Sequence, residues 1–384
     1  MSRVTVSPRV LHWAMERSDL TPADLERALP KIRQWLSGES LPTLRQLEAL
    51  AKRTLTPLGA LFLDEPPEDS LPIPHFRTLD DTAPTRPSAE LVATIRAMQR
   101  RQDWLRDYLI EQGEAPLPFV GTAGPGEPTA VVAERMRSAL AMEADWASEQ
   151  PNWESALRAL RRTIEDAGII VVVNGIVANN TSRKLSVDEF RGFVLVDDYA
   201  PLAFVNGGDA RAAQMFTLAH ELAHVFMGSS AAFDLRQMQP AGNPIEQACN
   251  RAAAEFLVPQ TRLREMWPDE QRDGGRLRML ARRFKVSEIV IARRALDCGL
   301  LSWGDFMAFY SECVEGERHA RSRRSGGGDF YTNQDQRVGR RFASAVARAV
   351  EREDLLYSEA YQLTDLYGQV FDKYVSRIPD EGAD

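Results

Sequence analysis

Two histidines and a glutamate lie within five consecutive residues, His220-Glu221-Leu222-Ala223-His224. Residues four apart on an α-helix share a face, so the two imidazoles can converge on one divalent ion such as zinc. Such an ion activates a water for hydrolysis, and Glu221 lies where it can take the proton of that water. The spacing therefore predicts one Zn²⁺ per chain, held by His220 and His224, with Glu221 as the catalytic base of a metallopeptidase.

The residues around this motif predict that it is buried. They are almost all apolar: Phe216, Leu218, Ala219, Leu222, Ala223, Val225, Phe226 and Met227. Buried histidine and glutamate side chains need polar partners, and one metal ion would serve all three. This context favours a metal site over a chance match on the polar face of a helix.

A zinc site of this kind needs a third protein ligand. Met227 and Ser230 stand where a metzincin would carry glycine and histidine, and His12, His75 and His319 are far away in the sequence. The third ligand is therefore expected to be a carboxylate downstream of the motif.

Three carboxylates are candidates for that ligand, namely Asp234, Glu246 and Glu255. Asp234 falls in a predicted loop, so its geometry leaves it open. Glu246 and Glu255 lie nine residues apart on one predicted helix. The rotation between them is about 900°, so they point to opposite faces and only one can be a ligand. We choose Glu246, because Asn250 and Ala253 give its face a stripe of small residues that allows a close approach to the motif helix.

Several other polar residues have predicted roles near the site. Asn250 is expected either to support a metal ligand from the layer behind it or to form an interhelical hydrogen bond. Glu255 is expected to be a salt-bridge or capping partner. Asn174 and Asn206, at the ends of two predicted strands, are candidate donors to the oxyanion of the reaction.

Continuous β-branched runs predict the strands that must support the site. They lie at 168–174, 192–197 and 202–206, and the turn 197–201 should join the last two in an antiparallel hairpin.

Helical patterns cover most of the remaining chain. Asp209 is predicted to cap the motif helix, which ends near Met227, and Pro259 should stop the helix that carries Glu246. Further helical stretches are predicted at 88–112, 129–167, 274–300 and 330–374. A hinge is predicted at 322–329.

Two separated motifs resemble one known family. Phe216-Thr-Leu-Ala-His-Glu-Leu-Ala-His224 and Glu246-Gln-Ala-Cys-Asn-Arg-Ala-Ala-Ala-Glu-Phe-Leu-Val-Pro259 are similar, in order, to the motifs of the ImmA/IrrE metallopeptidases. The resemblance covers roughly residues 165–260 and implies metal ligands at His220, His224 and Glu246, with Glu221 as the base.

Three residues depart from the family motifs, namely Ala223, Cys249 and Ala252. None of these departures removes a chemical group that the metal site needs. Known members of the family cleave helix-turn-helix repressors. The resemblance therefore implies a protein substrate, either such a repressor or a cognate toxin, in stress-response, mobile-element or toxin–antitoxin control.

Composition and charge are typical of a globular protein, with 44% hydrophobic and 27% charged residues among 384. The net charge of −8 argues against a surface that binds nucleic acid everywhere. Three cysteines are too few and too scattered for a disulfide framework. The N-terminus lacks a secretory signal and no apolar run is long enough for a membrane span, so we expect a cytoplasmic protein without a membrane partner.

These patterns predict an α+β fold that is mostly helical. A zincin-like peptidase core with a small antiparallel sheet should be flanked by helical N- and C-terminal modules. The predicted units are 1–63 (a degenerate helix-turn-helix), 64–87 (linker), 88–160 (helical connector), 161–270 (peptidase core), 271–315 (basic helices) and 316–384 (C-terminal module).

The N-terminal unit resembles an XRE-type helix-turn-helix through Trp35-Leu-Ser-Gly38 and Leu41-Pro-Thr-Leu-Arg-Gln-Leu-Glu48. From Thr21 to Trp35 the chain is about four residues shorter than that motif, and the turn that sets the angle of a recognition helix is missing. DNA binding and a protein-binding or autoinhibitory role are both open for this unit.

A second helix-turn-helix-like pattern follows the peptidase core. Residues 271–300 carry eight basic and three acidic side chains. The candidate nucleic-acid contacts are Arg282, Arg283, Lys285, Arg293 and Arg294. Such a cluster suits a phosphate backbone, and it suits an acidic protein or a solvated helix face equally.

Two hypotheses follow from the sequence. The first is a zinc endopeptidase that cleaves a specific regulatory protein. The second is a DNA- or toxin-binding regulator, or an antitoxin, in which the metal site is structural or dormant.

Overall fold

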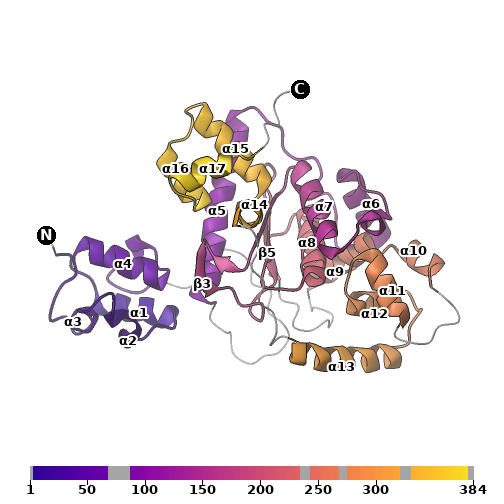
Figure 1. Cartoon of the computed structure of the whole chain (residues 1–384), viewed down its shortest axis with the longest axis horizontal. Coiled ribbons are helices and arrows are strands. Elements are labelled where there is room, and N and C mark those ends of the chain that lie inside the picture. The colour runs from indigo at the N-terminus through magenta and orange to yellow at the C-terminus, as the bar shows by residue number, and fades with distance from the viewer. Residues whose placement is uncertain (1–2, 68–86, 234–242, 268–274, 321–329, 379–384) are drawn as a thin grey trace.

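The computed structural model describes residues 3–67, 87–233, 243–267, 275–320 and 330–378 of the chain. A small sheet lies between two layers of helices, and a separate helical bundle extends from one side at the N-terminus (Figure 1). The predicted α+β fold, mostly helical, is confirmed. None of the described helices is both long and apolar enough to cross a membrane.

The central sheet has four strands in the order β1-β5-β4-β6. They are β1 (Ile170–Asn174), β4 (Gly192–Leu195), β5 (Leu202–Asn206) and β6 (Ala231–Phe233). The predicted hairpin of β4 and β5 is confirmed, and β6 pairs antiparallel with the other edge of β4.

The prediction of an antiparallel sheet is wrong at one pairing, because β1 lies parallel to β5. All five residues of β1 are buried. A continuous apolar run of this kind is typical of a strand covered on both faces, as parallel strands usually are. A small second sheet of β2 (Ile176–Val177) and β3 (Asn180–Lys184) was not predicted.

Side chains that alternate along each strand supply two hydrophobic cores, one on either face of the sheet. Val171, Val173 and Val205 face the core that contains the motif helix. Phe193 and Phe204 face the opposite core, where their rings stack with centroids 4.8 Å apart.

The helical layer on the site face is built around α8 (Arg211–Met227), the motif helix, and α9 (Pro244–Leu257). Ala210, and not the predicted Asp209, occupies the N-cap of α8, and Gly228 ends the helix in a left-handed conformation. The other elements of this layer are α6 (Thr129–Ala139), η2 (Trp146–Glu149), α7 (Trp153–Asp166), α10 (Gln260–Glu265), α11 (Gly275–Phe284), α12 (Glu288–Asp297) and α13 (Trp303–Ala320). The predicted basic helices α11 and α12 contribute to the same core as α8.

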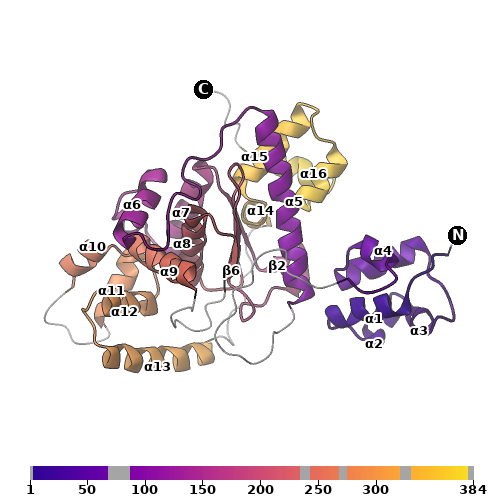
Figure 2. The ribbon, with the colours of Figure 1, turned by 180° about the vertical axis from the view of Figure 1, so that it is seen from behind.

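The opposite layer combines segments that are distant in sequence. It contains α5 (Ala89–Glu111), α14 (Phe330–Val338), α15 (Arg340–Glu351), α16 (Tyr357–Thr364) and α17 (Gln369–Val375). Figure 2 shows α5 running beside α15 and α16. Because α15 to α17 share the second hydrophobic core with the sheet and α5, the C-terminal helices complete the sandwich. The predicted hinge at 322–329 lies almost wholly outside the described residues.

The N-terminal bundle has its own core, which includes Leu25, Trp35 and Leu47. Its elements are α1 (Pro8–Arg17), α2 (Pro22–Glu26), α3 (Ile32–Leu36), α4 (Leu44–Thr54) and η1 (Leu58–Phe62). Thr21 and Thr43 are the N-cap residues of α2 and α4. Most of the predicted linker 64–87 lies outside the described residues.

Glu165, at the end of α7, is a buried carboxylate at the junction with the C-terminal helices. It accepts hydrogen bonds from the backbone N–H groups of Arg340 (2.6 Å) and Arg341 (3.4 Å) at the start of α15. Burial raises the pKa of Glu165 from 4.5 to about 7, although Arg161 and these hydrogen bonds favour its charged form.

This raised pKa predicts a pH-dependent stability. Between about pH 4.5 and pH 7 the unfolded chain loses the Glu165 proton while the folded chain keeps it, so stability falls as the pH rises. The total loss should be about 3 kcal/mol. Urea unfolding of wild type and Glu165→Gln at several pH values measures it. The loss attributable to Glu165 should be absent from the variant, and parallel curves for the two proteins would contradict this account.

Candidate metal centre and peptidase site

The motif helix α8 places His220 and His224 on one face, one turn apart, in the buried core. Both side chains and that of Glu221 are fully buried. The imidazole rings are 4.7 Å apart at their centroids, and their Nε2 atoms are 3.0 Å apart. The two imidazole nitrogens therefore converge on one position, as the four-residue spacing predicted.

Helix α9 brings Glu246 to the same spot from its first turn. The Asn243 side chain caps this helix by accepting a hydrogen bond from the Ile245 N–H, at 2.9 Å, and Pro244 occupies the first turn. Glu246 Oε2 lies 3.2 Å from His220 Nε2, and Glu246 Oε1 lies 3.1 Å from His224 Nε2.

The other carboxylate of this helix, Glu255, lies away from the histidines. It pairs with Arg294, and its Oε1 accepts a hydrogen bond from the Gln260 N–H at 3.2 Å. These contacts are the salt-bridge and capping roles that the sequence predicted. The remaining candidate ligand, Asp234, falls outside the described residues.

The spacing of the three donor atoms fits a divalent metal. A tetrahedral ion with bonds of about 2.0–2.1 Å to nitrogen and oxygen separates its ligand atoms by about 3.3 Å. The two imidazole nitrogens are 3.0 Å apart, and they lie 3.2 and 3.1 Å from the two different oxygens of the Glu246 carboxylate. Among the described residues, His220, His224 and Glu246 are the one group of three such side chains whose ligand atoms all lie within 4.8 Å of one another.

The protonation of the donors also fits a metal. Burial lowers the pKa of His220 to about 4, so its imidazole is uncharged at neutral pH. Burial raises the pKa of Glu246, but hydrogen bonds with His220 and His224 lower it more strongly, to about 2. Imidazole nitrogen and carboxylate oxygen are the donors that zinc prefers in catalytic sites.

Glu221 lies in the same core without a protein partner. Neither of its carboxylate oxygens has a hydrogen-bond partner within the part of the chain that the structure describes. Burial, followed by the negative charge of Glu246, raises the pKa of Glu221 well above its ordinary range. A carboxylate with a raised pKa is a stronger base, which is what proton transfer from water requires.

Gly192, the first residue of β4, gives the Glu221 carboxylate its space. A Cβ atom at position 192 would lie 2.8 Å from Glu221 Oε1, 2.5 Å from Thr217 Cγ2 and 2.8 Å from the carbonyl oxygen of Phe204. The last of these is a backbone atom of the neighbouring strand β5, so an alanine here would have to displace β4 as well as Glu221 and Thr217. Gly192 has no local signal in the sequence, because only the packing of α8 on the sheet brings it to the site.

Two residues of α9 lie close behind the ligands. The side chain of Asn250 lies close to the imidazole of His220, one of the three candidate ligands. Cys249 is fully buried, and its pKa is raised well above the ordinary value by burial and by the nearby charges of Glu246 and Glu221. The thiol is therefore protonated.

The two asparagines that were candidate oxyanion donors have other partners. Asn174 donates from its side-chain amide to the Ala178 carbonyl at 2.9 Å, and Asn206 donates to the Phe190 carbonyl at 3.2 Å. Both side chains fix turns at the ends of strands. Each asparagine thus stabilises the turn that follows its strand, and the role of either one as an oxyanion donor stays a prediction.

The five basic residues predicted as nucleic-acid contacts do not form one surface. Arg282 and Arg283 are exposed on α11. Lys285 and Arg294 are buried. Lys285 donates a hydrogen bond to the Arg282 carbonyl at 2.7 Å. Arg294 forms an ion pair with Glu255 and donates a hydrogen bond to the Val258 carbonyl. Arg293 pairs with Asp297 at 3.1 Å. A nucleic acid therefore cannot contact Lys285 or Arg294 in this structure.

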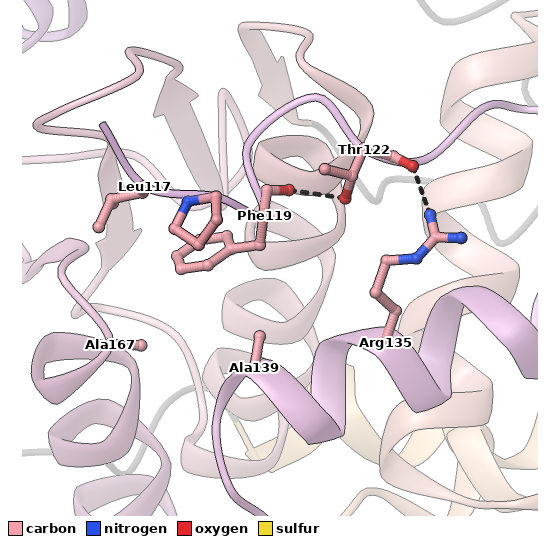
Figure 3. Close-up of a pocket in the computed structure, with 7 residues that line it drawn as sticks. Leu117, Phe119, Thr122, Arg135, Ala139 and Ala167 are labelled. Atoms are coloured by element: carbon pink, nitrogen blue, oxygen red, sulfur yellow. Dashed lines mark hydrogen bonds between the residues drawn. The ribbon is translucent and has the colours of Figure 1, made fainter. Parts of the chain in front are cut away.

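A shallow surface pocket is lined by residues outside the metal centre (Figure 3). It is formed where the segment 117–122 crosses α6, and Arg135 reaches the Thr122 carbonyl. The same segment caps α8, since Gly121 and Ala123 donate backbone N–H groups to the carbonyls of Val225 and Phe226 at 3.0 and 2.8 Å. The segment thus fixes the end of the motif helix, and the lining of the pocket contains none of the metal-site residues.

Comparisons with known proteins agree with this geometry. Residues 165–296 match the model of the Peptidase_M78 family, the IrrE N-terminal-like domain. This match supports the ImmA/IrrE family. It includes all four site residues on α8 and α9, and it suggests a metallopeptidase-like function at the level of the family. Residues 338–377 match a domain family of unknown function, DUF8813. No curated protein matches the chain.

The contact between β4 and Glu221 generates a prediction. Gly192→Ala should lower the cleavage of any protein that the wild type cuts by roughly 100-fold or more, because the general base is displaced. The metal content should stay the same, since the three atoms nearest to a Cβ atom at position 192 belong to Thr217, Glu221 and Phe204, none of which is a metal ligand. Gly126→Ala is a matched control, because a Cβ atom there meets nothing within 4 Å. Equal activity of the two variants would rule out a positioning role for Gly192.

Proposed function

We propose that the chain is a zinc-dependent endopeptidase that cleaves a specific regulatory protein. The observation that carries this proposal is the convergence of His220, His224 and Glu246 in a buried site, with the unpartnered carboxylate of Glu221 beside them. A purely structural metal site would have no need for a buried, unpartnered carboxylate next to the ligands.

The chemistry follows from the positions of these side chains. Zinc, when bound, polarises the scissile carbonyl group and makes water more acidic. Glu221 accepts the proton of the attacking water at a carboxylate oxygen and then donates that proton to the leaving amine nitrogen. The tight packing of α8 against α9 and the sheet holds Glu221 and excludes bulk water.

We propose a helix-turn-helix repressor or a cognate toxin as the substrate class. The resemblance to the ImmA/IrrE metallopeptidases, whose known members cleave helix-turn-helix repressors, supports a regulatory substrate. The complete burial of both histidines supports a selective enzyme, because a protease that digests proteins generally would need an open groove over its ligands.

A second candidate function is a DNA- or toxin-binding regulator, or an antitoxin, whose metal site is structural or dormant. The observation in its favour is the N-terminal bundle, which has its own core and two capped helices in a helix-turn-helix-like order. Binding to DNA from upstream of its own gene, weakening as salt is raised, would support this function. The two functions are compatible in one chain, since a binding module can deliver a protease to its target.

The enzyme proposal is tested by incubating wild type and Glu221→Gln with the proteins encoded by neighbouring genes. Mass spectrometry should find fragments with the wild type, and cleavage by the variant should be slower by roughly 100-fold or more, because glutamine cannot accept the proton. The variant should keep its metal, because Glu221 is not one of the three ligands. If Glu221→Gln cleaves as fast as the wild type, Glu221 is not the base. If the wild type with its metal cleaves none of these proteins, the regulatory alternative gains support.

A further inference from the structure

The C-terminal helices expose an unusual concentration of large apolar side chains. Of twelve such side chains exposed among the described residues, four lie between positions 356 and 370. Leu356 is 67% exposed, Tyr357 55%, Tyr367 61% and Val370 38%. Single exposed apolar residues are common on protein surfaces, whereas a contiguous group marks an interaction site.

Ring contacts join the tyrosines of this group to one another. Tyr361, half-buried between them, lies 6.1 Å from Tyr357 and 5.9 Å from Tyr367, measured between ring centroids. The buried ring of Phe371 lies beneath both Tyr357 and Tyr361, at 6.1 and 5.4 Å. We name the set Leu356, Tyr357, Tyr361, Tyr367 and Val370 the tyrosine face.

The tyrosine face is held rigidly by the core. Arg101 of α5, itself buried, donates to the carbonyls of Leu363 and Arg337 at 2.7 and 2.8 Å and pairs with Asp365 at 3.4 Å. These contacts fix the turn between α16 and α17, from which Tyr367 extends. A rigid surface loses little conformational entropy on binding, and tyrosine is among the residues that dominate binding interfaces.

The surroundings of the tyrosine face are acidic. Six acidic and three basic side chains lie between positions 351 and 378. Glu351, Glu353, Asp354, Glu359 and Asp372 are exposed, and none of the ion pairs found among the described residues involves them. A nucleic acid or an anionic membrane would be repelled by these carboxylates.

We propose that the tyrosine face is a docking site for a protein that presents an arginine-rich segment. Guanidinium groups stack on tyrosine rings and pair with carboxylates, and both kinds of partner lie together here. The face lies on the opposite side of the sheet from α8 (Figure 1), so a protein bound there would leave the metal centre uncovered. It also gives a role to the segment that matches the domain family of unknown function.

A fluorescence anisotropy experiment with the full chain tests this proposal. The probe is a labelled helical peptide with arginines and leucines on one face, and the control peptide has glutamate in place of arginine. Wild type should bind the arginine peptide more tightly, and its affinity should fall as salt is raised. Tyr357→Ser combined with Tyr367→Ser should weaken binding by roughly tenfold or more.

Two further variants sharpen the result. Glu353→Gln combined with Asp354→Asn should weaken binding and reduce its salt dependence. Trp303→Ser combined with Met307→Ser removes exposed apolar side chains elsewhere and should leave the affinity for the arginine peptide unchanged. Equal affinity for the two peptides, or an unchanged affinity after loss of both tyrosines, would overturn the proposal. Self-association of the wild type that the tyrosine variant abolishes would also overturn it, because the occupant would then be a second copy.

Discussion

The structure depends on holding two imidazoles and a carboxylate about 3 Å apart in the buried interior. Such a cluster is unfavourable in an apolar core unless a cation offsets the lone pairs and the charge that converge there. The cluster exists because α8 and α9 approach each other closely, through small side chains such as Ala252 and Ala253 that are buried between them. The Asn243 cap at the start of α9 and the segment 121–123 at the end of α8 then fix where each helix ends.

The sheet supplies the second constraint. Glu221 lies against β4 at a position where a side chain would collide with it, so glycine at 192 is part of the site although it carries no functional group. The sheet can act as this support because its other face is covered by α5 and the C-terminal helices. A segment more than a hundred residues after the motif therefore contributes to the rigidity of the site.

The sequence was sufficient for the parts of the site that follow from helix periodicity. The four-residue spacing placed the histidines, and the rotation between Glu246 and Glu255 separated a ligand position from a salt bridge. The hairpin of β4 and β5 followed from its turn. Tertiary packing decided the rest. Counting charges could not show that Lys285 and Arg294 are buried, and an apolar run could not by itself show that β1 lies parallel to β5. Gly192 had no local signal, because its role exists only once α8 rests on the sheet.

The central claim is that His220, His224 and Glu246 together hold one metal ion. Metal content per chain, measured by mass spectrometry on the purified protein after dialysis, tests it most directly. The account predicts about one zinc per chain in the wild type and a large loss in Glu246→Ala, whereas Glu255→Ala, on the same helix but away from the histidines, should keep its zinc. A wild type that neither contains nor takes up a divalent metal, or a Glu246→Ala variant that retains its zinc as firmly as the wild type, would contradict it.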